Sequence, residues 1–193
     1  AMNTSVDRGI NLVSLGANTG LNKVTYDPET RTISDVVKWR DPTVRKAESY
    51  LLGSQFFAYG VKSGYIVKNA AQWPFDVLRQ GERISGVVGP AVAAPIKNGK
   101  RVGVEILAQS APVGELKTPA VATYYTRSSG AGILNIGTSS WVCAIDNKCP
   151  GGNTFSITTR RQVAAVTGAI FEGITRGPLG KWRPATIDIP AQP

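Results

Sequence analysis

The stretch Ile10-Asn11-Leu12-Val13-Ser14-Leu15, followed directly by the loop Gly16-Ala17-Asn18-Thr19-Gly20, decides the class of fold. A short, mostly apolar run that ends in a glycine loop is typical of a buried parallel strand in an α/β sheet. Such a strand needs a neighbour on each side, and only residues 3–9 precede it here. We therefore predict an interior parallel strand over residues 10–15, close to the start of the sequence.

Antiparallel β-structure is predicted after this loop. Residues 23–26 and 31–39 have strand composition, and the turn formers between them favour a hairpin. Residues 55–94 combine aromatic side chains with turn formers, which predicts short strands and long loops. Further strands are expected at 120–127 and 133–142.

The turn Lys97-Asn98-Gly99-Lys100 is followed by one more predicted strand. There Val102, Val104 and Ile106 alternate with polar or small residues, as in a strand with one buried face. The alternation predicts that Glu105 faces outward.

Two helices can be placed from their ends. Asp41-Pro42 supplies an N-cap and a first-turn proline, so we predict a helix over residues 42–52 that stops at Gly53. The segment Thr159-Arg160-Arg161-Gln162 has the form of a capping box, and Gly177-Pro178 is a stop signal. Between them, four apolar residues fall on one helical face: Val163, Val166, Ile170 and Ile174. Residues 178–193 hold four prolines, which predicts a surface or disordered tail.

The composition excludes several kinds of chemistry. The chain has 193 residues, in the range of one domain, and contains no histidine. Histidine is the usual base and metal ligand near neutral pH, so Ser-His-Asp and Cys-His catalysis by this chain alone is excluded. The two cysteines, Cys143 and Cys149, match neither a zinc site nor a C-x-x-C redox motif. We predict that they form a disulfide around a short polar loop, which would place the protein in an oxidising compartment, either extracellular or in the cell envelope.

The net charge is +9, from 22 Lys and Arg against 13 Asp and Glu. The basic residues come as singles and pairs, with no recognition helix or long basic arm, so nucleic-acid binding is disfavoured. An anionic cell-wall polymer or a partner protein fits such a surface equally well. No apolar run approaches the ~20 residues of a membrane span, and the first residues lack the build of a signal peptide, so we expect any export signal to have been removed.

Several segments together resemble the C-terminal part of the N,N-dimethylformamidase large (beta) subunit-like family. The resemblance extends from about residue 5 to residue 177 and rests on short motifs, which are Arg8 to Asn18, Leu51-Leu52-Gly53, Val104 to Pro112, Ala122-Thr123-Tyr124-Tyr125, and Gly130 to Val142. It implies the C-terminal part of an α/β core related to class I glutamine amidotransferases, with a β-rich antiparallel insertion. The expected class is therefore α/β to α+β.

This resemblance suggests four segments. Residues 1–20 would form the end of a core strand with its glycine loop, and residues 21–128 the β-rich insertion with one short helix. Residues 129–177 would hold the returning strand, the disulfide loop and the C-terminal helix. Residues 178–193 would be the proline-rich tail.

The family's founding activity, as the resemblance implies it, is hydrolysis of a small formamide at one iron held by two tyrosines and a glutamate. Those ligands do not carry over to this chain. Relatives commonly show an aromatic pair shortly after the glycine loop, where this sequence has Leu21-Asn22, and a Gly-x-Glu step where it has Gly89-Pro90-Ala91. Part of the family signature also lies upstream of the first strand. We therefore expect no cofactor in this chain, and we expect it to be one piece of a larger protein.

Four residues are candidates for catalysis, and each also has an ordinary structural explanation. Asn18 follows a parallel strand, where α/β sheets bind ligands, but it also suits a turn. Tyr124 and Tyr125 are adjacent on a strand and so point to opposite faces, which suits packing better than a shared metal. Ser139 lies in a hydroxyl-rich run, yet a nucleophilic serine needs a base. Outside these four, Glu105 has the chemistry of an acid or a ligand, but we place it on the outer face of its strand.

Two classes of function remain. In the first, the chain is an exported, dimethylformamidase-like domain that is noncatalytic by itself and forms a structural or binding part of a larger amidohydrolase-like protein. An alternative within this class is an active carbon–nitrogen hydrolase whose metal site is completed by another segment or subunit. In the second, it is a glycan or cell-wall polymer binding module. The apolar strand at residues 10–15 should be covered by an upstream segment, another subunit or a copy of the chain. Expressed alone, the chain should then be oligomeric or poorly soluble.

Overall fold

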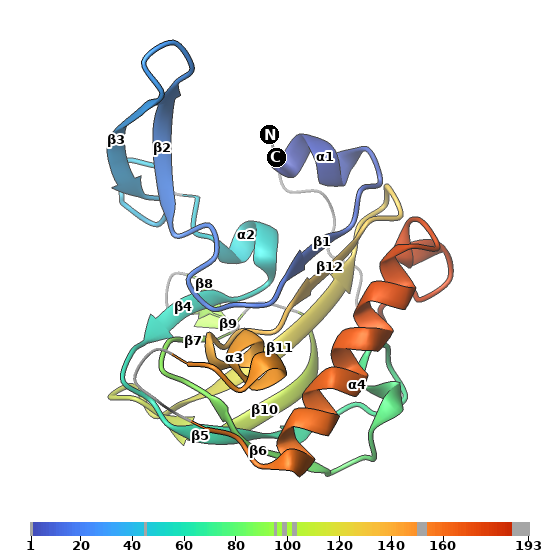
Figure 1. The fold of residues 1–193 in the computed structure, drawn as a ribbon. Coiled ribbons are helices and arrows are strands. Elements are labelled where there is room, and N and C mark those ends of the chain that lie inside the picture. Colours follow the sequence, from blue (N-terminus) through green and yellow to red (C-terminus); the bar gives the residue numbers. More distant parts are fainter. Residues whose placement is uncertain are drawn as a thin grey trace.

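The computed structural model describes residues 2–44, 46–94, 96–97, 100–101, 104–149 and 154–186 (Figure 1). Their main element is a six-stranded, curled sheet in the order β1-β12-β11-β10-β5-β6. Its strands are β1 (Leu12–Ser14), β12 (Gly132–Asn135), β11 (Thr118–Thr126), β10 (Glu105–Val113), β5 (Ser63–Val67) and β6 (Arg83–Val88). The fold is mixed α/β with mostly strands.

Parallel pairing is confined to one end of this sheet. β1 runs parallel to β12, while every other neighbouring pair in the sheet is antiparallel. The predicted parallel strand at residues 10–15 is thus confirmed as parallel, but the prediction that it is interior is wrong. Within the described part of the chain β1 is an edge strand, because only β12 pairs with it.

Both faces of the sheet are covered near β11 and β12. On one face the core includes Tyr124, Leu134 and Trp73, with side chains from the long helix α4 (Ile157–Ile174). On the other face a smaller cluster joins Tyr125 and Ile133 to residues of α1 (Met2–Asp7) and α2 (Ser49–Leu52). A strand between two covered faces has no polar side, which the alternating sequence pattern does not show.

The remaining elements connect these layers. They are β4 (Gln55–Ala58), which pairs with β7 (Val92–Ala94), the pair β8 (Ile96–Lys97) and β9 (Lys100–Arg101), the 3-10 turns η1 (Phe75–Val77) and η2 (Leu179–Lys181), and helix α3 (Ser140–Asp146). The pairing of β8 with β9 agrees with a hairpin at residues 97–100, although Asn98, Gly99, Val102 and Gly103 lie outside the described residues.

The predicted hairpin after the glycine loop is confirmed. β2 (Asn22–Asp27) and β3 (Thr32–Lys38) pair antiparallel and project from the body of the molecule (Figure 1). Asp27 shapes the turn, because its carboxylate accepts hydrogen bonds from the backbone of Glu29 and Thr30 and from the Thr30 hydroxyl.

Two predicted elements are shorter than expected. The helix predicted over residues 42–52 is reduced to α2, since the Asp41 carboxylate instead closes a local turn by accepting from the backbone and the hydroxyl of Thr43. Gly53 does end the helix in the left-handed conformation. The strand predicted over 133–142 stops at Asn135, because the chain turns at Gly137, which has φ 69°, and enters α3.

Helix α4 has the predicted apolar face. Val163, Val166 and Ile170 are buried. Its N-cap, however, is Ser156, whose hydroxyl accepts from the Thr159 backbone N–H at 3.1 Å, so the predicted capping box is displaced by one turn. No helix in the described residues is long and apolar enough to cross a membrane.

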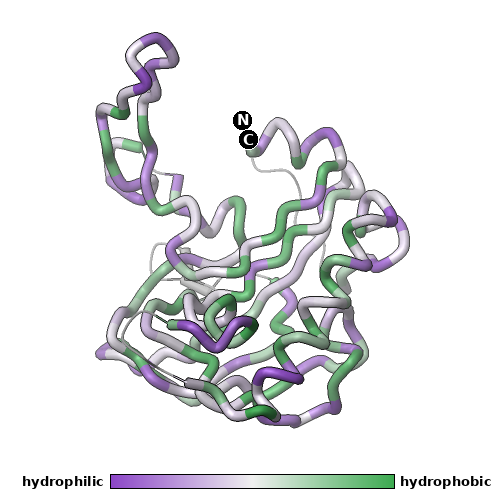
Figure 2. Tube along the Cα trace, viewed as in Figure 1, coloured by the Kyte–Doolittle hydropathy of each residue, from purple (hydrophilic) through white to green (hydrophobic). Residues whose placement is uncertain are grey.

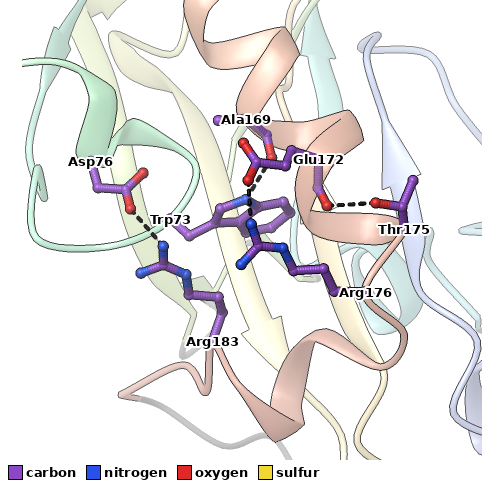
Figure 3. A network of polar contacts seen from close by, with 7 residues as sticks. All are labelled: Trp73, Asp76, Ala169, Glu172, Thr175, Arg176 and Arg183. Carbon is purple, nitrogen blue, oxygen red and sulfur yellow. Dashed lines mark hydrogen bonds and ion pairs between the residues drawn. The ribbon is translucent and has the colours of Figure 1, made fainter.

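The segment after α4 is packed rather than loose as far as residue 186. Leu179 is fully buried, and Arg183 forms an ion pair with Asp76 of η1 (Figure 3). The Trp73 indole N–H donates to the Ala169 carbonyl of α4, with 2.9 Å between the two atoms; the contact is drawn in Figure 3. Residues 179–186 thus lie at the surface but are anchored to the body by Leu179, while Lys181, Pro184 and Thr186 are exposed; residues 187–193 lie outside the described residues.

Candidate functional site

A buried polar row crosses the sheet at the carboxyl ends of its two parallel strands. Ser14 of β1, Asn135 of β12 and Thr123 of β11 are direct neighbours in the strand register and so share one face. All three are buried, as is Ser54, which follows α2. Ligands of α/β sheets bind outside the carboxyl ends of parallel strands, so this row is the candidate functional site.

The row is held by its own hydrogen bonds. The Asn135 amide donates to the Ser54 hydroxyl at 2.8 Å, and its carbonyl oxygen accepts from the Gly137 backbone at 3.1 Å. Ser14 and Thr19 share a hydroxyl contact of 2.7 Å, which ties the glycine loop to the strand end. The row therefore contains hydroxyls and an amide but neither an acid nor a base. Its side chains hold the strand ends and the glycine loop in position.

A buried ion pair lies in the segment that leads into α2. Arg40 contacts Glu48, whose side chain is 2% exposed, and so ties the chain after β3 to the start of α2. Among the described residues, neither the second carboxylate oxygen of Glu48 nor the Arg40 Nε, both buried, has a hydrogen-bond partner. Glu48 therefore depends on Arg40, because an unpaired buried charge is costly.

Asn18, the first catalytic candidate, is exposed in the loop that follows β1. It is not part of the hydrogen-bonded row, whereas its neighbour Thr19 is. The structure thus places Asn18 near the carboxyl end of β1 without bringing it together with the other candidates.

Ser139, the hydroxyl candidate, belongs to a different cluster. Its hydroxyl donates to the Gly89 carbonyl at 3.0 Å and accepts from the Ala91 backbone at 3.1 Å. Thr138 and Ser140 donate to the same Gly89 carbonyl. These three hydroxyls fix the Gly89-Pro90 loop, and the bonds of Ser139 are to backbone groups rather than to a base that could activate it.

A cavity of about 350 Å³ lies beside this loop. Its lining includes Lys62, Pro90 and Ser140, with Ser156 and Thr159 from the start of α4. Val61, Val88 and Phe155 add apolar surface to these hydroxyls and the lysine, and the described part of the lining contains no carboxylate. It is separate from the row at the carboxyl end of β1.

Tyr124 and Tyr125 point to opposite faces of β11, as predicted, and both are buried because both faces are covered. The Tyr124 hydroxyl donates to the Arg183 carbonyl at 2.7 Å, and that of Tyr125 to the Leu51 carbonyl at 2.6 Å. Burial raises the pKa of both phenols. Tyr65, whose pKa is likewise raised by burial, donates to the Ile136 carbonyl at 2.7 Å.

This arrangement does not fit an iron held by two tyrosines and a glutamate. A phenolate ligand must give up its proton, whereas these phenols use theirs in bonds to carbonyl oxygens. Tyr124 and Tyr125 also diverge across the sheet and cannot share one ion. Among the described residues no group of three or more Asp, Glu, His or Cys side chains could hold a metal.

Glu105 is the clearest correction at the residue level. It is 5% exposed rather than outward-facing, since it shares a row with Tyr124 on the face that α4 covers. Its carboxylate accepts from Asn69 at 2.6 Å, from Gln72 at 3.2 Å and from the Thr186 backbone at 3.3 Å. It thereby anchors the segment after α4.

The predicted disulfide is present and joins Cys143 to Cys149. Cys143 lies in α3 rather than in a strand, and Cys149 follows that helix. The bridge thus fixes the end of α3, while residues 150–153 lie outside the described residues.

Sequence reasoning missed the residues that organise the candidate site. Ser14 and Asn135 interrupt otherwise apolar strand runs, and this interruption is the signal that could have identified them. Asn11 is a third such residue: it accepts from the Gly132 and Leu179 backbones and donates to the Gly177 carbonyl. A polar residue within an apolar strand is retained only where its hydrogen bonds are satisfied.

A family model described as N,N-dimethylformamidase beta subunit-like, C-terminal, matches residues 1–151. The match includes β1, the projecting hairpin, β12 and α3, while α4 and the segment after it follow the matched region. No curated protein sequence matches the chain.

Proposed function

Because the chain belongs to the N,N-dimethylformamidase beta subunit-like family, as its C-terminal domain, we propose that it is a structural part of a larger amidohydrolase-like protein and is noncatalytic by itself. The observation that supports this most strongly is the state of the buried tyrosines. Each of the three donates its hydroxyl proton to a backbone carbonyl of another segment, and so stabilises the fold.

The domain would complete a sheet that extends beyond this chain. β1 is parallel to β12, and its other edge carries backbone donors and acceptors that no described strand pairs. The upstream segment, or another subunit that carries it, would add a strand at this edge. In this proposal the parallel pair is the end of a core related to class I glutamine amidotransferases.

An active amide hydrolase completed by another segment is the second candidate, and one observation favours it. The polar row of Ser14, Asn135 and Thr123 reaches β1 itself, so a strand added there would bring its own side chains next to this row. The domain would then supply one wall of a site whose acid, base or metal comes from the partner.

The disulfide supports a place outside the cytoplasm. A bridge between Cys143 and Cys149 persists in an oxidising compartment, so we include export to the cell envelope or the medium in the proposal.

Hydrogen exchange at β1 tests the proposed partner edge. In the isolated chain, amides of Leu12–Ser14 that do not face β12 should exchange rapidly, and co-expression with the upstream polypeptide should slow them at least about tenfold. The amides of β12 serve as the internal control, since both neighbours of that strand are present in either sample. Slow exchange at β1 in a monodisperse monomer would contradict the proposal.

A further inference from the structure

We propose that the cavity beside the Gly89-Pro90 loop binds a small carboxylate that carries a short apolar chain. The chain of the ligand would lie on the floor of the cavity, and its carboxylate would meet Lys62 at the rim. This goes beyond the structural role proposed above, because the cavity is separate from the polar row and from the open edge of β1. The way the cavity is built, its apolar floor and its charge carry the inference.

A bulge in β6 forms one wall of the cavity. The pairing of β5 with β6 changes register between Ser63 and Tyr65, so that residues 85–87 of β6 lie opposite Gly64 alone. The first two of these bulged residues line the cavity. Bulges bend a strand away from its ladder and are common next to binding and active sites.

Two glycines make this wall possible. A Cβ atom on Gly64 would lie 2.7 Å from the Ile84 carbonyl oxygen, so glycine is needed for β5 to approach the bulge this closely. Gly86 has φ 72°, in the left-handed region that favours glycine. A Cβ atom on Gly86 would have Phe155 as its nearest contact, at 4.0 Å. The chain therefore has no side chain at the point where one would narrow the cavity.

The other walls are held by hydrogen bonds. The Thr159 hydroxyl donates to the Ser85 carbonyl at 3.0 Å and ties the start of α4 to the bulge. Three hydroxyls hold the Gly89-Pro90 loop. The Phe155 backbone N–H donates to the Asn147 side chain at 2.8 Å, close to the disulfide. The cavity is thus preformed, and its volume of about 350 Å³ lies at the lower end of the range for ligand sites, which suits a small molecule.

The floor of the cavity is apolar. Val61 and Val88 are 8% and 1% exposed, and both belong to the hydrophobic core. Phe155 packs against the same core, and Pro90 adds a further apolar ring to the lining. Figure 2 shows hydrophobic and hydrophilic stretches next to each other at this end of the molecule, where β5 and β6 lie beside the start of α4. An apolar chain that enters the cavity would leave water for this floor.

The charge of the lining indicates the head group of the ligand. Lys62 is the one charged residue in the described part of the lining, and it is exposed. Ser85 and Thr154 add exposed hydroxyls, which can donate to an acceptor. The net charge of the chain, +9, also attracts an anion and repels a cation. A carboxylate accepts hydrogen bonds from an ammonium group and from hydroxyls, so it matches these groups.

Titration of the isotope-labelled 193-residue chain with sodium hexanoate, followed by proton–nitrogen NMR, tests the proposal. The amide signals of Gly86 and Ser156, which line the cavity, should shift and saturate with a Kd of about 1 mM, as expected for so small a ligand. Signals of the β2–β3 hairpin are the internal control and should not move.

Two further probes separate the contributions of the chain and the head group. Acetate keeps the carboxylate but lacks the chain, so it should bind at least about tenfold more weakly than hexanoate. Hexanamide keeps the chain without the charge, and it should bind at least about threefold more weakly than hexanoate. Equal binding of hexanoate and hexanamide would overturn the proposal, as would shifts that do not saturate or that lie away from the cavity.

Two lysines that flank β5 provide a matched pair of variants. Lys62→Gln should weaken hexanoate binding at least about threefold and leave hexanamide binding unchanged. Lys68→Gln removes the same charge at the other end of the strand, outside the described lining, and should bind hexanoate like the wild type. Equal loss of hexanoate binding in both variants, or no loss in Lys62→Gln, would overturn the proposal.

Discussion

At the scale of single residues, side chains of types that could take part in catalysis instead form hydrogen bonds that hold distant segments together. Glu105 anchors the segment after α4, and Tyr125 joins β11 to α2. These bonds link parts of the chain far apart in sequence, so each residue stabilises tertiary structure rather than one element. The hydroxyl proton of Tyr125 and the carboxylate lone pairs of Glu105 are already used in these hydrogen bonds.

The three buried tyrosines should make the stability of the fold decrease at alkaline pH. Burial raises the pKa of Tyr65, Tyr124 and Tyr125 in the folded protein above the ordinary value of about 10. Their contribution is complete below pH 10, where folded and unfolded phenols are both neutral, and is lost as pH rises toward the folded values, because the unfolded chain ionises first. We expect these three phenols to ionise only when the protein unfolds.

Absorbance titration of the phenolates, followed together with circular dichroism, shows whether these three phenols ionise before the protein unfolds or only when it does. Tyr65→Phe should remove one of the late-ionising groups, and it is the control for their assignment. Ionisation of all six tyrosines while the fold persists would contradict the prediction.

At the scale of elements, the sequence predicts structure set by neighbouring residues better than structure set by contacts between distant segments. The hairpin and the apolar face of α4 follow from periodicity and turn chemistry within a few residues, so the sequence predicts them well. The helix expected at 42–52 fails because Asp41 closes a turn in place of capping a long helix. Glu105 is misplaced because alternation assumes one covered face, and a second layer covers the other.

The ion pair between Arg40 and Glu48 couples the base of the hairpin to α2, and its loss should be costly. Arg40→Ala leaves a carboxylate that is 2% exposed without a cation, so we expect the free energy of unfolding to fall by about 2–4 kcal/mol. Replacement of both, Arg40→Ala/Glu48→Gln, should recover part of this loss. Urea denaturation gives the difference.

The matched control is Lys148→Ala, which breaks the exposed pair with Asp146 and should cost less than about 0.5 kcal/mol. Equal effects of Arg40→Ala and Lys148→Ala would show that the buried pair has no special role.

At the scale of the whole molecule, the proposed assembly rests on the open edge of β1, which only β12 pairs among the described strands. The edge position of β1 could not be predicted from sequence, because strand order depends on partners distant in the chain; only the short stretch before it gave a hint. The candidate site was difficult to predict from the sequence for the same reason. Its polar row comes from three strands, and only the polar residues within apolar runs indicated it.

We propose that this domain supports a larger amidohydrolase-like protein without performing the chemistry itself. The most direct test is to supply the purified chain with iron, measure the bound metal by elemental analysis, and assay release of dimethylamine from N,N-dimethylformamide. We predict no stoichiometric iron and no hydrolysis. One equivalent of tightly bound iron together with formamide hydrolysis, both lost in Tyr124→Phe or Tyr125→Phe, would contradict it.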